Sequence, residues 1–419
     1  MSVTSDNSRL SAILRTRVRG IPGGRPHRGA SQPRREWCAV TPSGHTRCEA
    51  LAAITGAKIV ERNELRLLRD GDVFFPAFLT AVRSARRTIA VQMFRFHGGQ
   101  VAREFADAFA ERARHGVRVR VLIDAYGTGT MHTSIRSVLI TAGVELHVYN
   151  PIRLHALHRA YRRSHRKLIA IDEHVAFLGG MNFDDAFAGG NGVRRWRENA
   201  VQIRGPLAGA IEASISATWA GASEVAVPAC ALSLHSVGPS HGQLFLSEHG
   251  TATMRDIYLH AVGSAQRSIS ITSAYLIPES DISSALVAAA RRGVDVRLLT
   301  TGAHNNITLA RLASHATYAT LLDAGVRIFE YGPTMLHAKS IVVDGEWCTF
   351  GSANVDACSL RHNLEANIGT CDAALVAEAE SAFATDLANA HEVTLADWRR
   401  RPLSRRVAEL ATLPLRSLL

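Results

Sequence analysis

Hydrophobic and polar positions alternate with two different periods from about residue 64 onward. The stretch QVAREFADAFAERARHG places Val101, Phe105 and Phe109 on one helical face with charged residues opposite, which predicts an amphipathic helix. The apolar runs TIAVQMF and VRVRVLID, each next to a helical stretch, predict buried strands. A regular alternation of helices and buried strands is typical of an α/β fold.

The order of these elements repeats in the second half of the chain. AVRSARRTIAV at 81–91 matches AVGSAQRSISI at 261–271, and TAGVELHVY at 141–149 matches DAGVRIFEY at 323–331. A repeat of this length predicts two similar α/β lobes that arose by internal duplication.

Composition divides the chain into five expected parts. The beginning is rich in Arg, Gly, Pro and Ser without a hydrophobic period, so we expect a basic, disordered arm, with lipid or nucleic-acid binding as an open alternative. The end combines an Arg cluster with Leu and Val, and it could anchor the protein to a surface or pack on the lobes. The parts are the arm at 1–50, a first lobe at 51–221, a linker at 222–243, a second lobe at 244–390 and a basic amphipathic tail at 391–419.

Charge and cysteine content narrow the environment. The 419-residue chain has a formal net charge of +11, which favours a phospholipid surface or nucleic acid as partner. No apolar stretch approaches the length of a transmembrane helix and no signal-peptide pattern is present, so action on a membrane is expected from its surface. The six cysteines show no CxxC and no paired Cys/His spacing, so we expect no metal site and a reducing cytosol, although Cys38 and Cys48 could pair.

Two nine-residue stretches carry the same polar residues. SHRKLIAID at 164–172 and LHAKSIVVD at 336–344 place His, Lys and Asp at equal positions, and they hold two of the only three lysines among 48 basic residues. Side chains alternate along a strand, so each His and its Lys should share a face. The Asp, seven positions after the His, should point the other way and support the end of the strand.

The same further polar residues follow each stretch. An Asn lies 17 positions after each His, at Asn182 and Asn354, and a Glu lies beyond it, at Glu198 and Glu365. Two lobes placed face to face would bring two His, two Lys and two Asn into one cleft.

This set of side chains suits phosphodiester chemistry. Lys and Asn would hold the non-bridging phosphate oxygens and stabilise a pentacoordinate transition state. One neutral His would attack phosphorus and the other would donate a proton to the leaving alkoxide. A carboxylate behind each imidazole would fix its tautomer, and no metal or other cofactor is required.

With its two HxKxxxxD motifs, the chain resembles the phospholipase D superfamily. Over roughly residues 64–400 it is most similar to bacterial cardiolipin synthases without transmembrane helices, through VRVLIDAYG, GGMN, WRE and GSANVD. The resemblance favours His165 as nucleophile and His337 as acid and base, although the sequence leaves this order open. It implies a catalytic set of His165, Lys167, Asp172, His337, Lys339, Asp344, Glu198 and Glu365, and a phosphate-binding set of Lys167, Asn182, Lys339 and Asn354.

The resemblance implies a metal-independent phosphatidyltransferase that makes diphosphatidylglycerol from phosphatidylglycerol through a covalent phosphohistidine and releases glycerol. The expected partner is an anionic phospholipid membrane, with no obligatory nucleic acid, and the expected location is cytoplasmic and peripheral on the inner face of the cell membrane. The oligomeric state stays open.

Three alternatives remain. Water as acceptor would give a phospholipase D-type hydrolase. A phosphodiesterase or nuclease fits the charge, but aromatic residues make up only 6% of the chain and no basic strand carries interleaved aromatics. A non-catalytic lipid-binding protein would be expected to have lost one motif, and both are intact.

The chain departs from its relatives at two places, of which the first is a mild change and the second bears on the substrate more than on the chemistry. Glu198 stands where many relatives have Asp, and Cys358 and Ser359 stand where Arg-Ser is common. The second change could alter recognition of the acceptor or of the headgroup.

Overall fold

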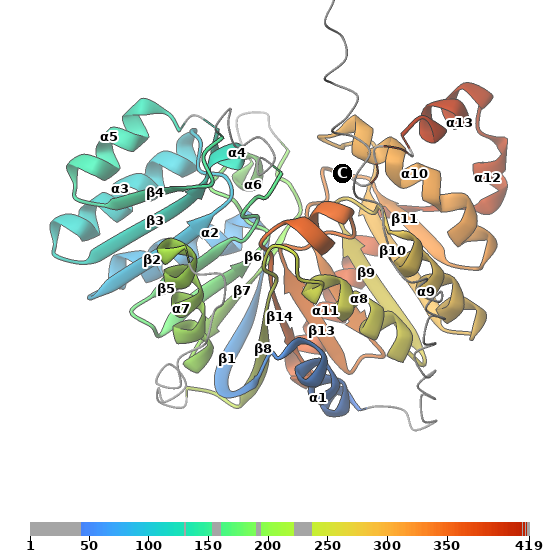
Figure 1. The fold of residues 1–419 in the computed structure, drawn as a ribbon, viewed down its shortest axis with the longest axis horizontal. Coiled ribbons are helices and arrows are strands. Elements are labelled where there is room, and N and C mark those ends of the chain that lie inside the picture. The colour runs from blue at the N-terminus through green and yellow to red at the C-terminus, as the bar shows by residue number, and fades with distance from the viewer. Residues whose placement is uncertain are drawn as a thin grey trace, which may run out of the picture. The chain divides into compact units, whose positions relative to one another are not determined.

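Figure 1 shows the fold of the chain in a computed structural model. The structure describes residues 43–129, 131–152, 161–189, 194–221, 237–412, 414 and 416. Most of the expected N-terminal arm and of the expected linker therefore lie outside the described residues.

The first lobe is built on a mixed sheet. Its central strands β2 and β3 are parallel, and the helix α3 connects them, as parallel neighbours require. The strand order is β1-β7-β6-β5-β2-β3-β4, formed by β1 (Ile59–Arg69), β2 (Thr88–Met93), β3 (Arg118–Asp124), β4 (Glu145–Tyr149), β5 (Leu168–Ile171), β6 (Val175–Gly179) and β7 (Asn199–Arg204).

The second lobe repeats this order and adds one edge strand. Its order is β8-β14-β13-β12-β9-β10-β11-β15, formed by β8 (Ser240–Leu246), β9 (Ser268–Ser273), β10 (Asp295–Thr301), β11 (Arg327–Tyr331), β12 (Ser340–Val343), β13 (Trp347–Gly351), β14 (Ala366–Thr370) and β15 (Ala390–Val393). The antiparallel pair of β1 and β8 joins the two lobes into one 15-stranded sheet within the described residues. The expected α/β fold with two similar lobes is confirmed.

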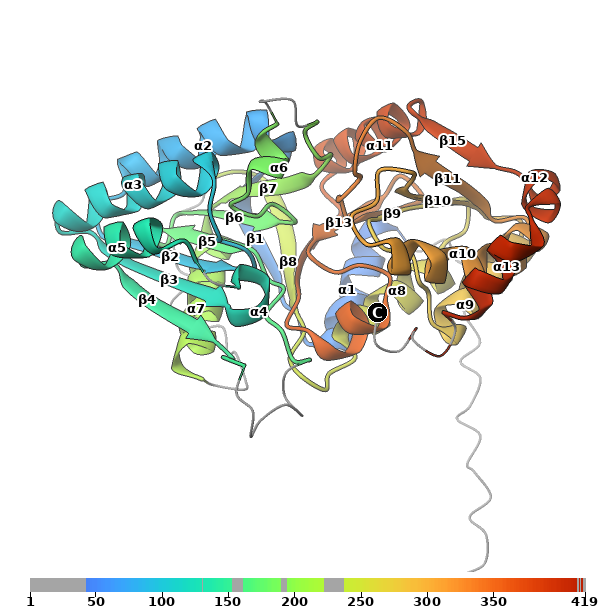
Figure 2. The ribbon, with the colours of Figure 1, turned by 90° about the horizontal axis from the view of Figure 1, so that it is seen from above.

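Helices cover both faces of the sheet. In the first lobe, α2 (Asp70–Ser84) and α3 (Gln100–Arg114) lie on one side of the strands and α7 (Pro206–Ala220) on the other, as Figure 2 shows. The second lobe has the corresponding helices α8 (Thr253–Ser264), α9 (Ser280–Arg291) and α11 (Ala373–Leu387). The shorter or more peripheral helices are α4 (Ala125–Thr128), α5 (Thr133–Thr141), α6 (Asp185–Ala188), α10 (Thr308–Asp323), the π-helix η3 (Cys358–His362), α12 (Leu395–Arg400) and α13 (Leu403–Leu410).

One hydrophobic core crosses the junction between the lobes. Leu207 and Ile211 of α7 share a buried cluster with Phe350 of β13, Ile368 of β14 and Val376 of α11. Because this cluster spans both lobes, opening them would expose apolar surface to water. The junction therefore fixes the position of one motif relative to the other.

Helix α1 (Gly44–Thr55) falls partly within the expected disordered arm and shifts that boundary. Ser43 caps its first turn, and Gly56 ends it in the left-handed conformation at φ 75°. Although α1 precedes the first lobe in the sequence, Cys48 and Leu51 are buried in the core of the second lobe. The apolar pattern of α1 is weak because a charged residue, Arg47, occupies a buried position.

The other expected boundaries also move. Strand β8 begins at Ser240, inside the expected linker, and β15 crosses the expected boundary at residue 390. In the tail, α13 packs against α10 and buries Glu409, which accepts hydrogen bonds from Arg401. The tail thus packs on the second lobe, while Leu403, Val407 and Leu410 of α13 remain exposed.

No helix among the described residues combines the length and the apolar character that a bilayer crossing needs.

Candidate active site

Each motif histidine lies at the start of a strand and is held by the opposite lobe. His165 precedes β5, and its backbone N–H donates to the carbonyl of Leu364 over 2.9 Å. His337 precedes β12, and its N–H donates to the carbonyl of Arg197 over 2.8 Å. The segment before each strand therefore reaches into the other lobe, which brings the two motifs into one site.

The carboxylates behind the imidazoles are exchanged between the lobes. His165 Nδ1 lies 2.9 Å and 3.0 Å from the two carboxylate oxygens of Glu365 in the second lobe. His337 Nδ1 lies 2.5 Å from Oε2 of Glu198 in the first lobe. Both carboxylates are buried, and the side chains of His165 and His337 keep only 12% and 7% exposure. Because Nδ1 of each ring contacts a carboxylate, Nε2 is the nitrogen available for reaction.

The two motif lysines are buried directly before β5 and β12, and the Nζ of each contacts its own histidine. Lys167 Nζ donates to the carbonyl of His165 over 2.6 Å. Lys339 Nζ lies 2.8 Å from Nδ1 of His337 and 3.5 Å from Glu198 Oε2.

The two asparagines also lie in the buried interior. Asn182 is 5% exposed, and its Oδ1 accepts a hydrogen bond from the backbone N–H of Arg95 over 3.1 Å, which leaves the amide NH₂ as donor. Asn354 is 2% exposed, and within the described part of the chain its Oδ1 has no hydrogen-bond partner. A buried amide with unused hydrogen-bonding capacity is suited to meet a polar ligand.

The motif aspartates lie at the far ends of the strands, as their odd offset predicts. Asp172 accepts hydrogen bonds from the backbone N–H groups of residues 86, 87 and 88 over 2.7–2.8 Å. Asp344 binds the corresponding N–H groups of residues 266, 267 and 268, and in addition forms a buried 3.0 Å ion pair with Arg47 of α1. Both aspartates adopt left-handed backbone conformations, at φ 53° and 57°. They anchor the loops before β2 and β9. Among the described residues, neither aspartate forms a hydrogen bond with an imidazole of the site.

Burial lowers the pKa of both histidines. For His165, Glu365 opposes this shift and Lys167 adds to it. The pKa of His337 falls well below its usual value, because Lys339, Lys167 and His165 add to the effect of burial. Both imidazoles are therefore neutral near pH 7, and charges from one motif act on the histidine of the other.

The buried cations and carboxyls respond to the same environment. Burial lowers the pKa of Lys167 to about 7, with Glu365 opposing and Lys339 adding to the shift. Burial raises the pKa of Glu198. For Glu365 burial acts in the same direction, but His165, Lys167 and Ser352 outweigh it and the pKa is lowered. The carboxyl behind His165 thus ionises more easily than an ordinary glutamate, and the carboxyl behind His337 ionises less easily.

A serine and a glycine at equivalent positions account for part of this difference. In the turn of the second lobe, Ser352 Oγ donates a short hydrogen bond to Glu365. The first lobe has Gly180 at that position, and a Cβ atom there would lie 2.0 Å from Glu198 Oε2. A side chain at this position would displace the Glu198 carboxyl from its present place, and with glycine there the carboxyl has no hydroxyl partner at that position. The difference between Gly180 and Ser352 is visible when GGMN and GSAN are aligned. Its effect on the two glutamates becomes apparent only from the contacts in the structure.

Aromatic rings pack against the two imidazoles. The ring of Phe94 lies 4.9 Å from that of His165, and the rings of Trp196 and Phe187 lie 5.6 Å and 5.4 Å from that of His337. Sequence reasoning noted Trp196 only as part of WRE and missed the other two. They limit the access of water to the site.

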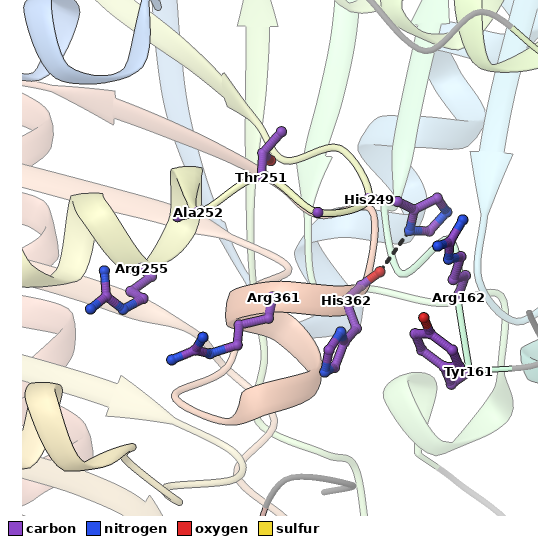
Figure 3. A pocket seen from close by; sticks show the side chains of 9 residues that line it. Tyr161, Arg162, His249, Thr251, Ala252, Arg255, Arg361 and His362 are labelled. Atoms are coloured by element: carbon purple, nitrogen blue, oxygen red, sulfur yellow. Dashed lines mark hydrogen bonds between the residues drawn. The ribbon is translucent and has the colours of Figure 1, made fainter. Parts of the chain in front are cut away.

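A basic pocket of about 400 Å³ lies beside the segments that lead into the site (Figure 3). From the first lobe it is lined by Tyr161 and by Arg162, which lies three positions before His165. From the second lobe it is lined by His249, Arg255 and the η3 residues Arg361 and His362. His249 Nδ1 lies 2.6 Å from the carbonyl oxygen of His362 and so connects two of its walls. Arg255 and Arg361 are ion-paired with Asp281 and Glu279, so their charge is partly compensated.

Comparison with protein families identifies the chain. A family model described as "Cardiolipin synthase, PLD-like domain" matches residues 78–219 and 258–387, which are the two lobes. The chain belongs to this family. The match in two segments agrees with the repeated strand order.

Curated relatives cover most of the chain. Cardiolipin synthase A of Pseudomonas putida (strain W619) is 33% identical over 359 residues, which are 83% of this chain and 74% of the relative. Cardiolipin synthase 2 of Bacillus cereus is 32% identical over 356 residues, 83% of this chain and 69% of the relative.

Solved structures share the fold at low sequence identity. Phosphatidylserine synthase of Haemophilus influenzae superposes with a TM-score of 0.68 at 13% identity, over 89% of this chain and all of that chain. Polyphosphate kinase of Porphyromonas gingivalis superposes with a TM-score of 0.56 at 12% identity, over 85% of this chain and 53% of that chain. At these identities the likeness concerns the fold alone.

Proposed function

We propose that this member of the family is a phosphatidyltransferase that joins two molecules of phosphatidylglycerol into diphosphatidylglycerol and releases glycerol. The observation that carries the proposal is the pair of histidines with little exposure, each with Nδ1 against a carboxyl group of the opposite lobe and with a buried lysine beside it. The relatives named cardiolipin synthase support a phospholipid as substrate.

In the first step, Nε2 of His165 attacks phosphorus, and the bond from phosphorus to the glycerol oxygen breaks. The lowered pKa of His165 keeps the imidazole neutral, and the ionised Glu365 behind it stabilises the positive charge that develops on the ring. These features favour His165 as the nucleophile.

The leaving glycerol oxygen takes a proton from Nε2 of His337. The raised pKa of Glu198 helps the pair of His337 and Glu198 to keep a proton, which passes to Nδ1 as Nε2 donates. In the second step, the glycerol hydroxyl of a second phosphatidylglycerol returns a proton to His337 and attacks phosphorus. The bond between phosphorus and His165 breaks, and the free imidazole is restored.

The lysines and asparagines stabilise the phosphate in this scheme. Lys167, Lys339, Asn182 and Asn354 provide donors for the non-bridging oxygens as negative charge builds up in the transition state. A compact ammonium satisfies one oxygen without the planar fork of a guanidinium, which explains why lysine persists here in a chain whose basic residues are nearly all arginine. Asp172 and Asp344 act indirectly by fixing the strands.

The acceptor decides between synthesis and hydrolysis. The low exposure of His165 and His337 and the aromatic rings around them disfavour water and favour a lipid hydroxyl. The basic pocket of Figure 3 is suited to the phosphate of the acceptor lipid, because Arg162 and His362 line it close to the motif segments.

The substrate is reached from the membrane surface in this proposal, on the inner face of the cell membrane. Helix α13 exposes Leu403, Val407 and Leu410 at 73%, 58% and 59%, at spacings of four and three residues that put them on one face. Arg405 and Arg406 lie between them in the sequence and suit anionic headgroups.

The test is a lipid-product assay. Wild type, H165A and H337A are incubated with radiolabelled phosphatidylglycerol vesicles, with and without chelator, and the lipids are separated. We expect diphosphatidylglycerol and glycerol from wild type in both conditions and neither from the variants. Phosphatidic acid as the sole product would replace the proposal by a hydrolase. A rate abolished by the chelator while the protein stays folded, as circular dichroism would show, would contradict metal-independent chemistry.

A further inference from the structure

Three potential metal ligands from distant parts of the sequence meet outside the motif site. They are Cys48 of α1, His241 of β8 and Cys371 directly after β14. The two sulfur atoms lie 3.3 Å apart, and His241 Nε2 lies 2.7 Å from Cys371 Sγ. Among the described residues, these form a group whose three ligand atoms all lie within 4.8 Å of one another.

The surrounding backbone holds this group in place. Thr370 Oγ1 donates to the carbonyl of His241 over 2.6 Å, and Gln243 Nε2 donates to the carbonyl of Cys48 over 3.0 Å. Gly44 allows α1 to approach, because a Cβ atom there would lie 2.7 Å from Cβ of Cys371 and 2.1 Å from a backbone carbonyl oxygen. Cys48 is completely buried, while the other two ligands are partly accessible. The group is therefore enclosed on one side and open to an entering ion on the other.

The donor set selects a class of metal. Two thiolates and one imidazole suit zinc and similar divalent transition metals, whereas magnesium and calcium prefer oxygen ligands. In tetrahedral zinc sites the ligand atoms lie roughly 3.5–3.8 Å apart. The two short contacts would lengthen by less than about 1 Å, and the remaining pair, which lies within 4.8 Å, would close by up to about 1.3 Å. The side-chain rotations of two cysteines and one histidine allow such a shift.

We propose that Cys48, His241 and Cys371 form a structural binding site for a zinc-class divalent metal ion. The fourth ligand is water or His45, whose ring centroid lies 6.4 Å from that of His241. The site was not expected from the sequence, since the two cysteines are 323 positions apart and have no local spacing pattern.

The metal would fasten α1 to the second lobe. Residue 47, next to Cys48, is the arginine that forms the buried ion pair with Asp344 of the second motif. Fixing α1 therefore also fixes the support of strand β12, which begins directly after Lys339. The proposed ion stabilises the fold and takes no part in the phosphoryl chemistry.

The test uses the full-length reduced protein and cobalt(II) as probe. Tetrahedral Co²⁺ bound by thiolates has visible d–d bands and a near-ultraviolet charge-transfer band, and Zn²⁺ displaces it. We expect one Co²⁺ per chain, loss of these bands on addition of Zn²⁺, and a higher melting temperature of the wild type with Zn²⁺ than with chelator.

Three variants and two controls locate the site. C48S, C371S and H241Q should each abolish the thiolate–cobalt spectrum, while C358S and H391Q should retain it, because neither residue belongs to the group. The wild-type spectrum and melting shift remain informative even if a variant fails to fold.

Two results would overturn the proposal. One is a reduced wild-type protein that binds neither Co²⁺ nor Zn²⁺. Peptide mapping of a sample kept in air would then show whether Cys48 and Cys371 form a disulfide in place of a metal site. The other is a cobalt spectrum that persists in all three ligand variants.

Discussion

Individual residues make the two halves of the site unequal, although their motifs are the same. Ser352 donates to Glu365, whereas glycine at the equivalent position leaves Glu198 without that donor. The pKa of Glu365 is lowered and that of Glu198 is raised. We infer that this difference assigns the nucleophilic role to one histidine and the proton-donating role to the other.

Substitution S352A tests this assignment. Loss of a hydrogen bond to a charged group costs about 1.5–3 kcal/mol, so kcat/KM should fall roughly tenfold to a hundredfold. Without the donor the pKa of Glu365 rises, so the carboxylate becomes protonated at a higher pH and the acidic limb of the pH–rate profile moves upward. Steady-state kinetics across pH measures both effects, with S284A on the exposed surface of α9 as control. An unchanged acidic limb would refute the role of Ser352.

The buried lysine gives a second prediction at this scale. Because the pKa of Lys167 is lowered to about 7, the free enzyme loses this positive charge as pH rises through that value. We expect kcat/KM to fall above about pH 7. The corresponding fall of kcat should occur at a higher pH than the fall of kcat/KM, because the bound phosphate anion favours the charged form of Lys167. A pH profile of kcat/KM that is flat from 6 to 9 would contradict a phosphate-binding role for Lys167.

At the level of elements, the two motif aspartates differ in what they hold. Asp172 and Asp344 each bind three backbone N–H groups, but only Asp344 has a buried arginine partner, Arg47 on α1. Asparagine retains the shape and tolerates the left-handed backbone at both positions. The pair D172N and D344N therefore isolates the contribution of the ion pair.

We expect D344N to lower the free energy of unfolding by about 3–5 kcal/mol, because it leaves a buried guanidinium unpaired. D172N should cost only about 1–2 kcal/mol, the scale of weakened hydrogen bonds to a carboxylate. Urea unfolding of both variants measures the difference. Equal losses would mean that α1 does not support the second motif.

Much of each element could be predicted from the sequence. Helical and strand periods gave α3, β2 and β3, and strand alternation placed each His and Lys on one face with the Asp behind. The exchange of Glu198 and Glu365 between the lobes could not be predicted, because both pairings satisfy the same spacing. Helix α1 was missed because a buried Arg47 interrupts its apolar face and its partners are distant in sequence.

For the whole molecule, we propose that the apolar face of α13 brings the site to its lipid substrate. Transfer of Leu403, Val407 and Leu410 into a lipid interface would bury their exposed apolar side chains at about 25 cal/mol per Å². The triple serine variant should bind anionic vesicles at least about tenfold more weakly. Vesicle sedimentation measures this, with the exposed Ile140 and Ile307 changed to serine as control. Equal binding of both variants would exclude α13 as the membrane contact.

The central claim, that His165 carries the phosphatidyl group between two lipids, is tested most directly by trapping the intermediate. Wild type and H165A are mixed with phosphorus-labelled phosphatidylglycerol, quenched in alkali within the first turnover and mapped by peptide. We predict label on the peptide that contains His165 in wild type, lost again when unlabelled phosphatidylglycerol is added before the quench, and no label in H165A. Label on the peptide that contains His337, or synthesis of diphosphatidylglycerol by H165A, would contradict the account.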